Sequence, residues 1–275
     1  WPGGACASSR GPEVRNAPLA PMENCLTRHL IAASALALSL GLPAQAFDLS
    51  KLTEAERPAL RDEVRSYLLD NPEVIMEAIE VLETRQQQAA AENDVDLIKA
   101  NATAIFEDSN SWVGGNPEGD ITVVEFLDYR CGYCRKAYGE VEELVKSDGN
   151  IRFIVKEFPI LGEESLLASK FAIATRLVAG DDAYKQVHDA LYNLRGDVTA
   201  DSLGALAKKL GLDAASITAK MDAPEVEQII AANHELGTAM QINGTPSFVI
   251  DGTMLRGYVP LDGMRQIVAA ERAKG

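Results

Sequence analysis

A cysteine pair in the pattern C-x-x-C, at residues 131–134, constrains this chain more than any other feature. An apolar, β-branched run at 121–127 precedes it and predicts a buried strand, and residues 135–146 have the pattern of a helix. The pair therefore opens a helix, where unpaired backbone N–H groups and the positive end of the helix dipole stabilise a thiolate. We predict that Cys131 is the exposed nucleophile and that Cys134, one turn deeper, resolves the mixed disulfide.

Gly132 and Tyr133, between the two cysteines, are placed to tune the thiolate and to shape the approach of a substrate. A structural zinc site needs about four ligands, yet besides the two cysteines the chain after residue 46 offers only His188 and His234 as imidazole or thiolate ligands. A structural disulfide would close a loop of four residues, which constrains the unfolded chain little. Binding of Cu(I) by the two thiolates remains an alternative because soft ligands suit this ion. No other cofactor is expected.

The first 46 residues are expected to be absent from the mature protein. Residues 1–21 are rich in Gly, Pro, Ser and Ala and are interpreted as upstream, non-native sequence. Residues 22–46 have the pattern of a cleavable signal peptide, with an apolar run at 30–42 and a small-x-small site at 44–46. The run has 13 residues, fewer than the ~20 that span a bilayer. We therefore expect the mature protein in the periplasm.

Residues 47–108 are predicted to form a helical region in front of the main domain. The Asn-Pro pair at 71–72 is a helix start signal, and apolar residues recur at helical spacing on both sides of a polar stretch at 83–93. One helix over 72–106 would be about 50 Å long, too long to bury both of its ends in one small domain. Two interpretations stay open: an oligomerisation arm formed by residues 48–108, and a helical pair that folds onto its own domain.

The rest of the chain, residues 109–275, predicts an α/β domain. Strands at 121–127 and 151–158, joined by one helix, form a parallel βαβ unit with a right-handed crossover. A helical stretch follows at about 163–240, and then a two-stranded hairpin at 247–258 and a final helix. This order predicts a thioredoxin fold with a helical insertion between its βαβ and ββα halves.

Two positions outside the cysteine motif carry chemical information. Glu125 interrupts the apolar strand, and if that strand is buried on both faces, the carboxylate is costly and its pKa should be raised. It precedes Cys131 by six residues, close enough to exchange a proton with the resolving thiol. The alternative is an edge position that faces solvent. Thr245 and Pro246 lie just before the strand that begins at Ser247, where a proline is tolerated.

These residues together resemble the DsbA-like branch of the thioredoxin superfamily. The resemblance covers about residues 111–275 and depends on E-F-L-D-Y-R-C-G-Y-C at 125–134, the helical insertion, and G-T-P-S-F at 244–248. It implies a thiol–disulfide oxidoreductase in which Pro246 is cis, lies beside Cys131 and presents backbone groups to an extended substrate peptide.

The resemblance also implies that Glu125 is the buried acid, that Thr245 contacts the active-site sulfur, and that Lys156 is a candidate partner for Glu125. The chain departs from the best-known oxidase of this branch at two places. It has Gly132 and Tyr133 where that enzyme has Pro-His, and Thr245 where that enzyme has Val. Threonine at this position is similar to the isomerase and reductase members.

The helical region is similar to the N-terminal arm of ScsC-type proteins, which are linked to copper tolerance and some of which oligomerise. The leading hypothesis is thiol–disulfide exchange on cysteine-containing exported proteins, as a disulfide isomerase or reductase, with a membrane redox partner that reduces or reoxidises the pair. The alternatives are a copper-binding protein that uses the same dithiol, and a monomeric disulfide oxidase. With 41 acidic and 26 basic residues and a net charge of −15, nucleic acid is not expected as a partner.

Overall fold

The computed structural model describes residues 52–275. The predicted upstream segment, the signal peptide and the first residues of the helical region lie outside the described residues. The chain divides between Asp70 and Asn71 into two compact units, and each is described by itself. Within residues 52–275, no helix is both long enough and apolar enough to cross a membrane.

The first unit contains helix α1 (Glu56–Asp70). A capping box begins it: Thr53 Oγ1 accepts a hydrogen bond from the Glu56 N–H at 3.3 Å, and Glu56 Oε2 accepts one from the Thr53 N–H at 2.8 Å. None of its residues is buried, although Val64 and Leu69 are apolar. Within its own unit, α1 is therefore stabilised by local hydrogen bonds and not by burial of its side chains.

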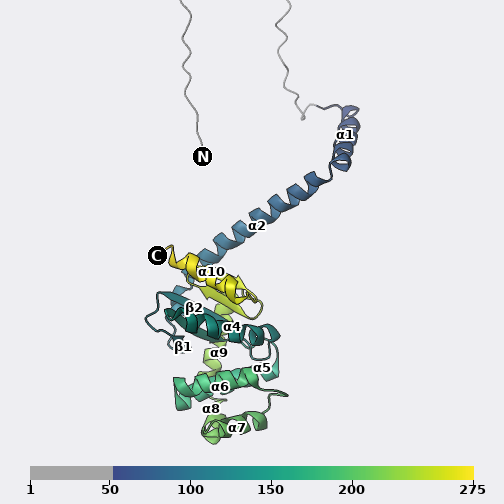
Figure 1. Cartoon of the computed structure of the whole chain (residues 1–275). Coiled ribbons are helices and arrows are strands. Elements are labelled where there is room, and N and C mark those ends of the chain that lie inside the picture. Colours follow the sequence, from purple (N-terminus) through teal and green to yellow (C-terminus); the bar gives the residue numbers. More distant parts are fainter. Residues whose placement is uncertain (1–51) are drawn as a thin grey trace, which may run out of the picture. The chain divides into compact units, whose positions relative to one another are not determined.

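The second unit begins with α2 (Glu73–Ala100), which ends at Asn101 and is followed by the short helix α3 (Ala102–Phe106). A single helix over 72–106, one of the cases considered above, does not form, because the chain is interrupted at Asn101, where φ is −113°. The only buried residues of α2 are Asp94 and Ile98, near its C-terminal end. Figure 1 shows that this end of α2 lies against the sheet domain.

Five strands form one sheet in the order β1-β3-β2-β4-β5. Strands β2 and β3 are parallel, and the other neighbours are antiparallel. Helix α4 (Gly132–Asp148) joins β2 to β3, so the predicted βαβ unit is confirmed. The pattern did not predict β1, because its two glycines suggested a turn. The strand bounds are β1 Trp112–Gly115, β2 Ile121–Leu127, β3 Ile151–Glu157, β4 Ser247–Ile250 and β5 Thr253–Arg256.

Five helices lie between β3 and β4, as the predicted helical insertion requires. Thr199 is the N-cap residue of α7, and its Oγ1 accepts a hydrogen bond from the Ser202 N–H at 3.1 Å. Helix α9 begins at Pro224. The fold is therefore the predicted thioredoxin fold with a helical insertion. The helix bounds are α5 Glu163–Ala179, α6 Asp181–Asn193, α7 Ala200–Lys209, α8 Ala214–Lys220, α9 Pro224–Ala239 and, after β5, α10 Leu261–Arg272.

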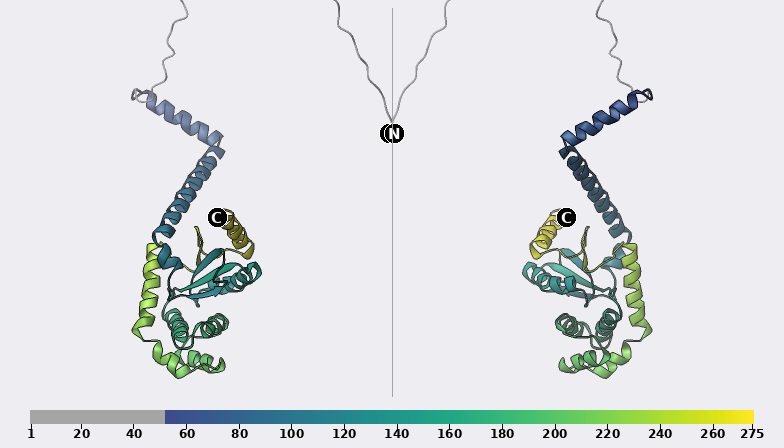
Figure 2. Two further views of the ribbon diagram at one scale, coloured as in Figure 1. Left: turned by 90° about the vertical axis from the view of Figure 1, so that its left-hand side faces the viewer. Right: turned by 90° about the vertical axis from the view of Figure 1, so that its right-hand side faces the viewer.

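The two faces of the sheet carry separate apolar cores. Alternate residues of β2 point to opposite faces, so Val123 packs with α4 and α10, whereas Val124 and Phe126 pack with α3 and the end of α9. Figure 2 shows α4 and α10 on one side of the sheet and α9 on the other. Because Glu125 follows Val124, its side chain points to the α4 face.

Candidate functional site

The two cysteines lie at the N-terminus of α4, as predicted. Cys131 is the N-cap residue with φ −72° and ψ 120°, and its Sγ accepts a hydrogen bond from the Cys134 N–H at 3.5 Å. Both are free thiols. An N-cap sulfur receives the unpaired N–H groups of the first helical turn, which stabilise its anion.

The predicted difference in accessibility is present but smaller than expected. Cys134 is 0% exposed, and Cys131 is only 7% exposed. The expectation of an exposed Cys131 is therefore wrong for the dithiol form. The reason is tertiary, because the loop that contains Thr245 covers the sulfur, and the Cys131 Sγ–H donates a hydrogen bond to Thr245 O at 3.1 Å.

The Thr245–Pro246 peptide bond is cis, as the resemblance implies. It lies at the entrance to β4, the neighbour of β2 in the sheet, and this places Thr245 against Cys131. The carbonyl of Pro246 accepts a hydrogen bond from the Gly257 N–H at 2.9 Å, which ties the loop to the end of β5. Thr245 contacts Cys131 through its carbonyl, whereas its Oγ1 is buried and has no hydrogen-bond partner among the described residues.

Glu125 is buried on the α4 face of β2, with 2% of its surface exposed. The alternative of a solvent-facing edge position is therefore wrong. Burial, with smaller effects from the charges of Glu142 and Glu157, raises the pKa of Glu125 to about 8. Burial first, and then the charge of Glu125, raise the pKa of Cys134. The carboxyl group of Glu125 and the thiol of Cys134 therefore both favour their protonated forms in this site.

Lys156 does not pair with Glu125, so that expectation is wrong. Its Nζ donates hydrogen bonds to Asp108 Oδ2 at 2.7 Å and to Ala104 O at 2.9 Å. The register explains this, because Lys156 lies opposite Phe126 in the β2–β3 pair, and Phe126 points to the face away from Glu125. Glu125 Oε1 has no hydrogen-bond partner among the described residues.

Glu157 is a second buried carboxyl group on the α4 face, and it was not among the residues predicted for the site. It accepts hydrogen bonds of 2.7 Å from the hydroxyls of Tyr129, Tyr184 and Ser169. Burial raises the pKa of Glu157 to about 7, against the opposite effect of these three hydroxyls. The available signal was its position two residues after Val155, which places both side chains on one face.

The side chain of Tyr133 is 63% exposed beside the cysteines. It stacks on Tyr258 with ring centroids 6.2 Å apart, and Lys136 Nζ lies 4.1 Å from the centre of the Tyr258 ring. Tyr258 in turn donates a hydrogen bond to Glu140 Oε1 at 2.7 Å. Tyr133 is therefore held as part of a small aromatic surface next to the motif, which suits the predicted role in substrate approach.

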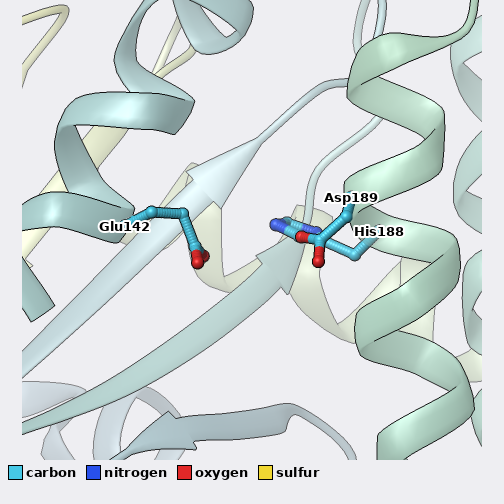
Figure 3. A group of neighbouring side chains, drawn as sticks. All are labelled: Glu142, His188 and Asp189. Atoms are coloured by element: carbon cyan, nitrogen blue, oxygen red, sulfur yellow. The ribbon is translucent and has the colours of Figure 1, made fainter. Parts of the chain in front are cut away.

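Glu142, His188 and Asp189 form a cluster in which one ligand atom of each lies within 4.8 Å of the others (Figure 3). The Lys185 ammonium group already lies 2.6 Å from Asp189 Oδ1 and 3.2 Å from Glu142 Oε2. His188 Nδ1 is 3.0 Å from the hydroxyl of Tyr129, and burial lowers the pKa of His188 to about 3. The two carboxylates thus already share a cation of the chain, and His188 is a neutral core residue.

Two family models match this chain. The DSBA-like thioredoxin domain matches residues 122–269. The N-terminal domain of the copper resistance protein ScsC matches residues 56–89, which include α1 and the first part of α2.

Several known proteins are similar to this chain. A thioredoxin-like oxidoreductase from Silicibacter pomeroyi is 39% identical, with a TM-score of 0.58, and the match covers 63% of this chain and 98% of that protein. BcfH from Salmonella enterica Typhimurium is 29% identical, with a TM-score of 0.67, covering 80% of this chain and 97% of BcfH. The Na(+)/H(+) antiporter NhaA 1 of Salinispora arenicola is 27% identical over 158 residues, which are 58% of this chain. The chain spans about a quarter of the length of such antiporters.

Proposed function

Since the chain belongs to the DSBA-like thioredoxin-domain family, we propose that it exchanges thiols and disulfides with cysteine-containing exported proteins in the periplasm. The observation that carries this proposal is the position of Cys131. Its sulfur caps α4 and lies 3.1 Å from the carbonyl of Thr245. A nucleophilic sulfur is thereby placed beside backbone groups that an extended client peptide can pair with.

The chemistry follows from the two sulfurs and one carboxyl group. The Cys131 thiolate attacks one sulfur of a client disulfide, a new S–S bond forms, and the other client sulfur leaves as a thiolate. Cys134 then gives its proton to the Glu125 carboxylate and attacks Cys131 Sγ, and the second client sulfur leaves. The client gains two electrons, and Cys131 and Cys134 become joined. A general base works best when its pKa lies near the working pH. The pKa of Glu125, about 8, is close to neutral pH.

We favour isomerase or reductase activity over oxidase activity. Threonine before the cis-proline supports this, and so does the match of the helical region to the ScsC N-terminal domain. In isomerisation a thiol of the client, rather than Cys134, attacks the mixed disulfide, so the protein must be kept as the dithiol. A membrane redox partner is the proposed source of the electrons.

We further propose that the helical region, residues 48–108, forms a homo-oligomer. Each of the two long helices of this region, α1 and α2, carries large apolar side chains that are exposed in the single chain. These are Val64, Tyr67, Leu69, Ile75, Met76, Ile79, Val81 and Leu82, all at least 43% exposed. An oligomer would bury this apolar surface. We expect Ile79→Arg to lower the mass measured by light scattering, and Glu80→Arg, beside it on the same helix, to leave the mass unchanged.

The experiment that tests the proposed activity is refolding of a scrambled disulfide protein. Cys131→Ser is expected to abolish it, and Cys134→Ser is expected to accumulate a mixed disulfide with the client, visible on a non-reducing gel. Refolding that continues at the wild-type rate with Cys131→Ser would refute the assignment. Thiol trapping in cell extracts separates the two directions, since an isomerase is found as the dithiol and an oxidase as the disulfide.

A second candidate function is Cu(I) binding, favoured by the family match to a copper resistance protein. Cys131 and Cys134 fit this ion, because they offer two soft sulfur ligands in a site that is nearly closed to solvent. Competition with a chromogenic Cu(I) chelator tests it. Tight binding that either Cys→Ser change removes, together with no turnover of disulfides, would support a binding protein in place of an enzyme.

A further inference from the structure

An open cavity of about 490 Å³, lined by several neutral polar residues, lies between the C-terminal part of α2 and the cis-proline loop. This volume is within the range of about 300–1,000 Å³ that is usual for ligand sites. One wall comes from α2 and the other from the chain between α9 and β4. The lining residues that matter here are Ala90, Asn93, Gln241, Asn243, Gly244 and Thr245.

The cavity is next to the nucleophile. Thr245 lines it and also accepts the hydrogen bond of the Cys131 thiol, at 3.1 Å. Thr245 therefore connects the cavity to the sulfur of Cys131, and a peptide bound in the cavity would continue toward the sulfur along the cis-proline loop. When the thiol loses its proton, the carbonyl of Thr245 becomes free to accept a backbone N–H of that peptide.

The side chains that line the cavity indicate which ligand groups it can bind. Among the described residues that line it, the two charged ones, Asp94 and Arg256, pair with each other, with Arg256 Nη1 2.5 Å from Asp94 Oδ2. Asn93 and Gln241 are exposed, and their side-chain amides make no hydrogen bond within residues 52–275. Neutral amides that both donate and accept match the peptide backbone and neutral polar side chains.

The wall formed by α2 is fixed to the catalytic domain. Besides the pair with Asp94, Arg256 Nη2 donates a hydrogen bond to Met240 O at 3.2 Å. Arg256 therefore joins α2, β5 and the chain that leads to the cis-proline loop. This side chain therefore contacts both walls of the cavity, α2 through Asp94 and the segment before the cis-proline loop through Met240.

We propose that this cavity binds the client polypeptide beside its reacting cysteine, as an extended segment with neutral polar residues, and that α2 is part of the client site. The inference rests on the proposed thiol–disulfide exchange and adds its recognition surface. Helix α2 would then select clients through Ala90 and Asn93, in addition to its role in the helical region.

The run Ala89-Ala90-Ala91 provides a matched test. Ala90 lines the cavity, whereas Ala91, which is also exposed, does not. Ala90→Trp fills the cavity, and Ala91→Trp places the same side chain on another face of the helix. Two substrates are compared: a short unstructured peptide of Ser, Asn and Gly residues with one cysteine disulfide-bonded to glutathione, and a small aromatic disulfide that is too short to enter the cavity.

With the peptide, Ala90→Trp is expected to lower kcat/KM by about tenfold or more, equivalent to at least about 1.4 kcal/mol of lost binding in the transition state. With the small disulfide, both variants should stay within about twofold of wild type, because the cysteines are untouched. Asn93→Ala should lower only the peptide rate, in the same direction. Equal losses on both substrates, or no loss on the peptide, would overturn the proposal. Absence of exchange by the wild-type protein on either substrate would instead refute the proposed function.

Discussion

Replacing Glu125 by glutamine should stabilise the protein, and the gain should depend on pH. The carboxyl group is 2% exposed and burial raises its pKa from 4.5 to about 8. A folded-state pKa above the unfolded value means that folding favours the protonated form. The stability that depends on protonated Glu125 is therefore fully present below about pH 4.5. It declines as the pH rises and is lost once the pH passes about 8.

The size of this loss follows from the two pKa values. At about 1.4 kcal/mol per pH unit, the interval from 4.5 to about 8 corresponds to about 5 kcal/mol at pH 8 and above, and to about 3 kcal/mol near pH 7. This is a large part of the 5–15 kcal/mol that is typical of folded domains, to order of magnitude. Glutamine has the same shape and cannot ionise, so Glu125→Gln keeps the packing and removes the pH-dependent cost.

Urea unfolding of the reduced protein at about pH 5 and about pH 8 measures the effect. Wild type and Glu125→Gln should be nearly equal at the lower pH, and the variant should be more stable by several kcal/mol at the higher pH. Glu118→Gln is the control, because Glu118 is exposed and its carboxylate makes no ion pair within residues 52–275. A difference that is the same at both pH values, or a variant that is less stable at about pH 8, would refute the desolvation argument.

Three further changes test other contacts. Tyr184→Phe removes one of three hydroxyls that donate to Glu157 and should cost about 1–3 kcal/mol of unfolding free energy. The cost should be larger at about pH 8 than at about pH 6, since Glu157 ionises at a pKa of about 7; Tyr138→Phe, whose hydroxyl donates to the partly exposed Asp189, should show no such dependence. Asp108→Asn leaves the Lys156 ammonium group, 1% exposed, without a counter-charge and should cost about 3 kcal/mol, whereas Asp120→Asn, in a surface pair with Arg272, should cost less than about 1 kcal/mol; equal costs in urea would contradict the burial argument. Asp94→Ala should raise amide hydrogen exchange in the last turns of α2 while the global stability falls by only about 1 kcal/mol; unchanged exchange, as expected for exposed Asp96→Ala, would show that the pair with Arg256 does not hold the helix.

Local patterns were sufficient to predict most of the strands and helices of the catalytic domain, with β1 as the exception. Each of these elements depends on residues that are close together in the sequence. The β-branched run predicts β2, the helical pattern after the cysteines predicts α4, and a proline marks the start of α9. Glu125 was also predictable as a buried acid, because it is the one charged residue in an apolar strand. These features need only the periodicity of strands and helices.

Features that depend on register or on distant contacts were not predictable in the same way. The partner of Lys156 is decided by the β2–β3 register, which places it on the face away from Glu125. The donors to Glu157 come from the loop after β2 and from helices α5 and α6, and no spacing in the sequence brings these together. Strand β1 has a turn-like composition and is defined by its pairing with β3.

The hydrogen bond between Cys131 and Thr245 joins positions 114 residues apart, with the whole helical insertion between them. During synthesis both cysteines therefore leave the ribosome well before the loop that covers them exists. Until β4 pairs with β2, the reactive sulfur is an ordinary cysteine of a nascent chain, open to oxidation or to coupling with a wrong thiol. The cysteine pair is thus shielded only after the C-terminal strands have been synthesised and β4 has paired with β2.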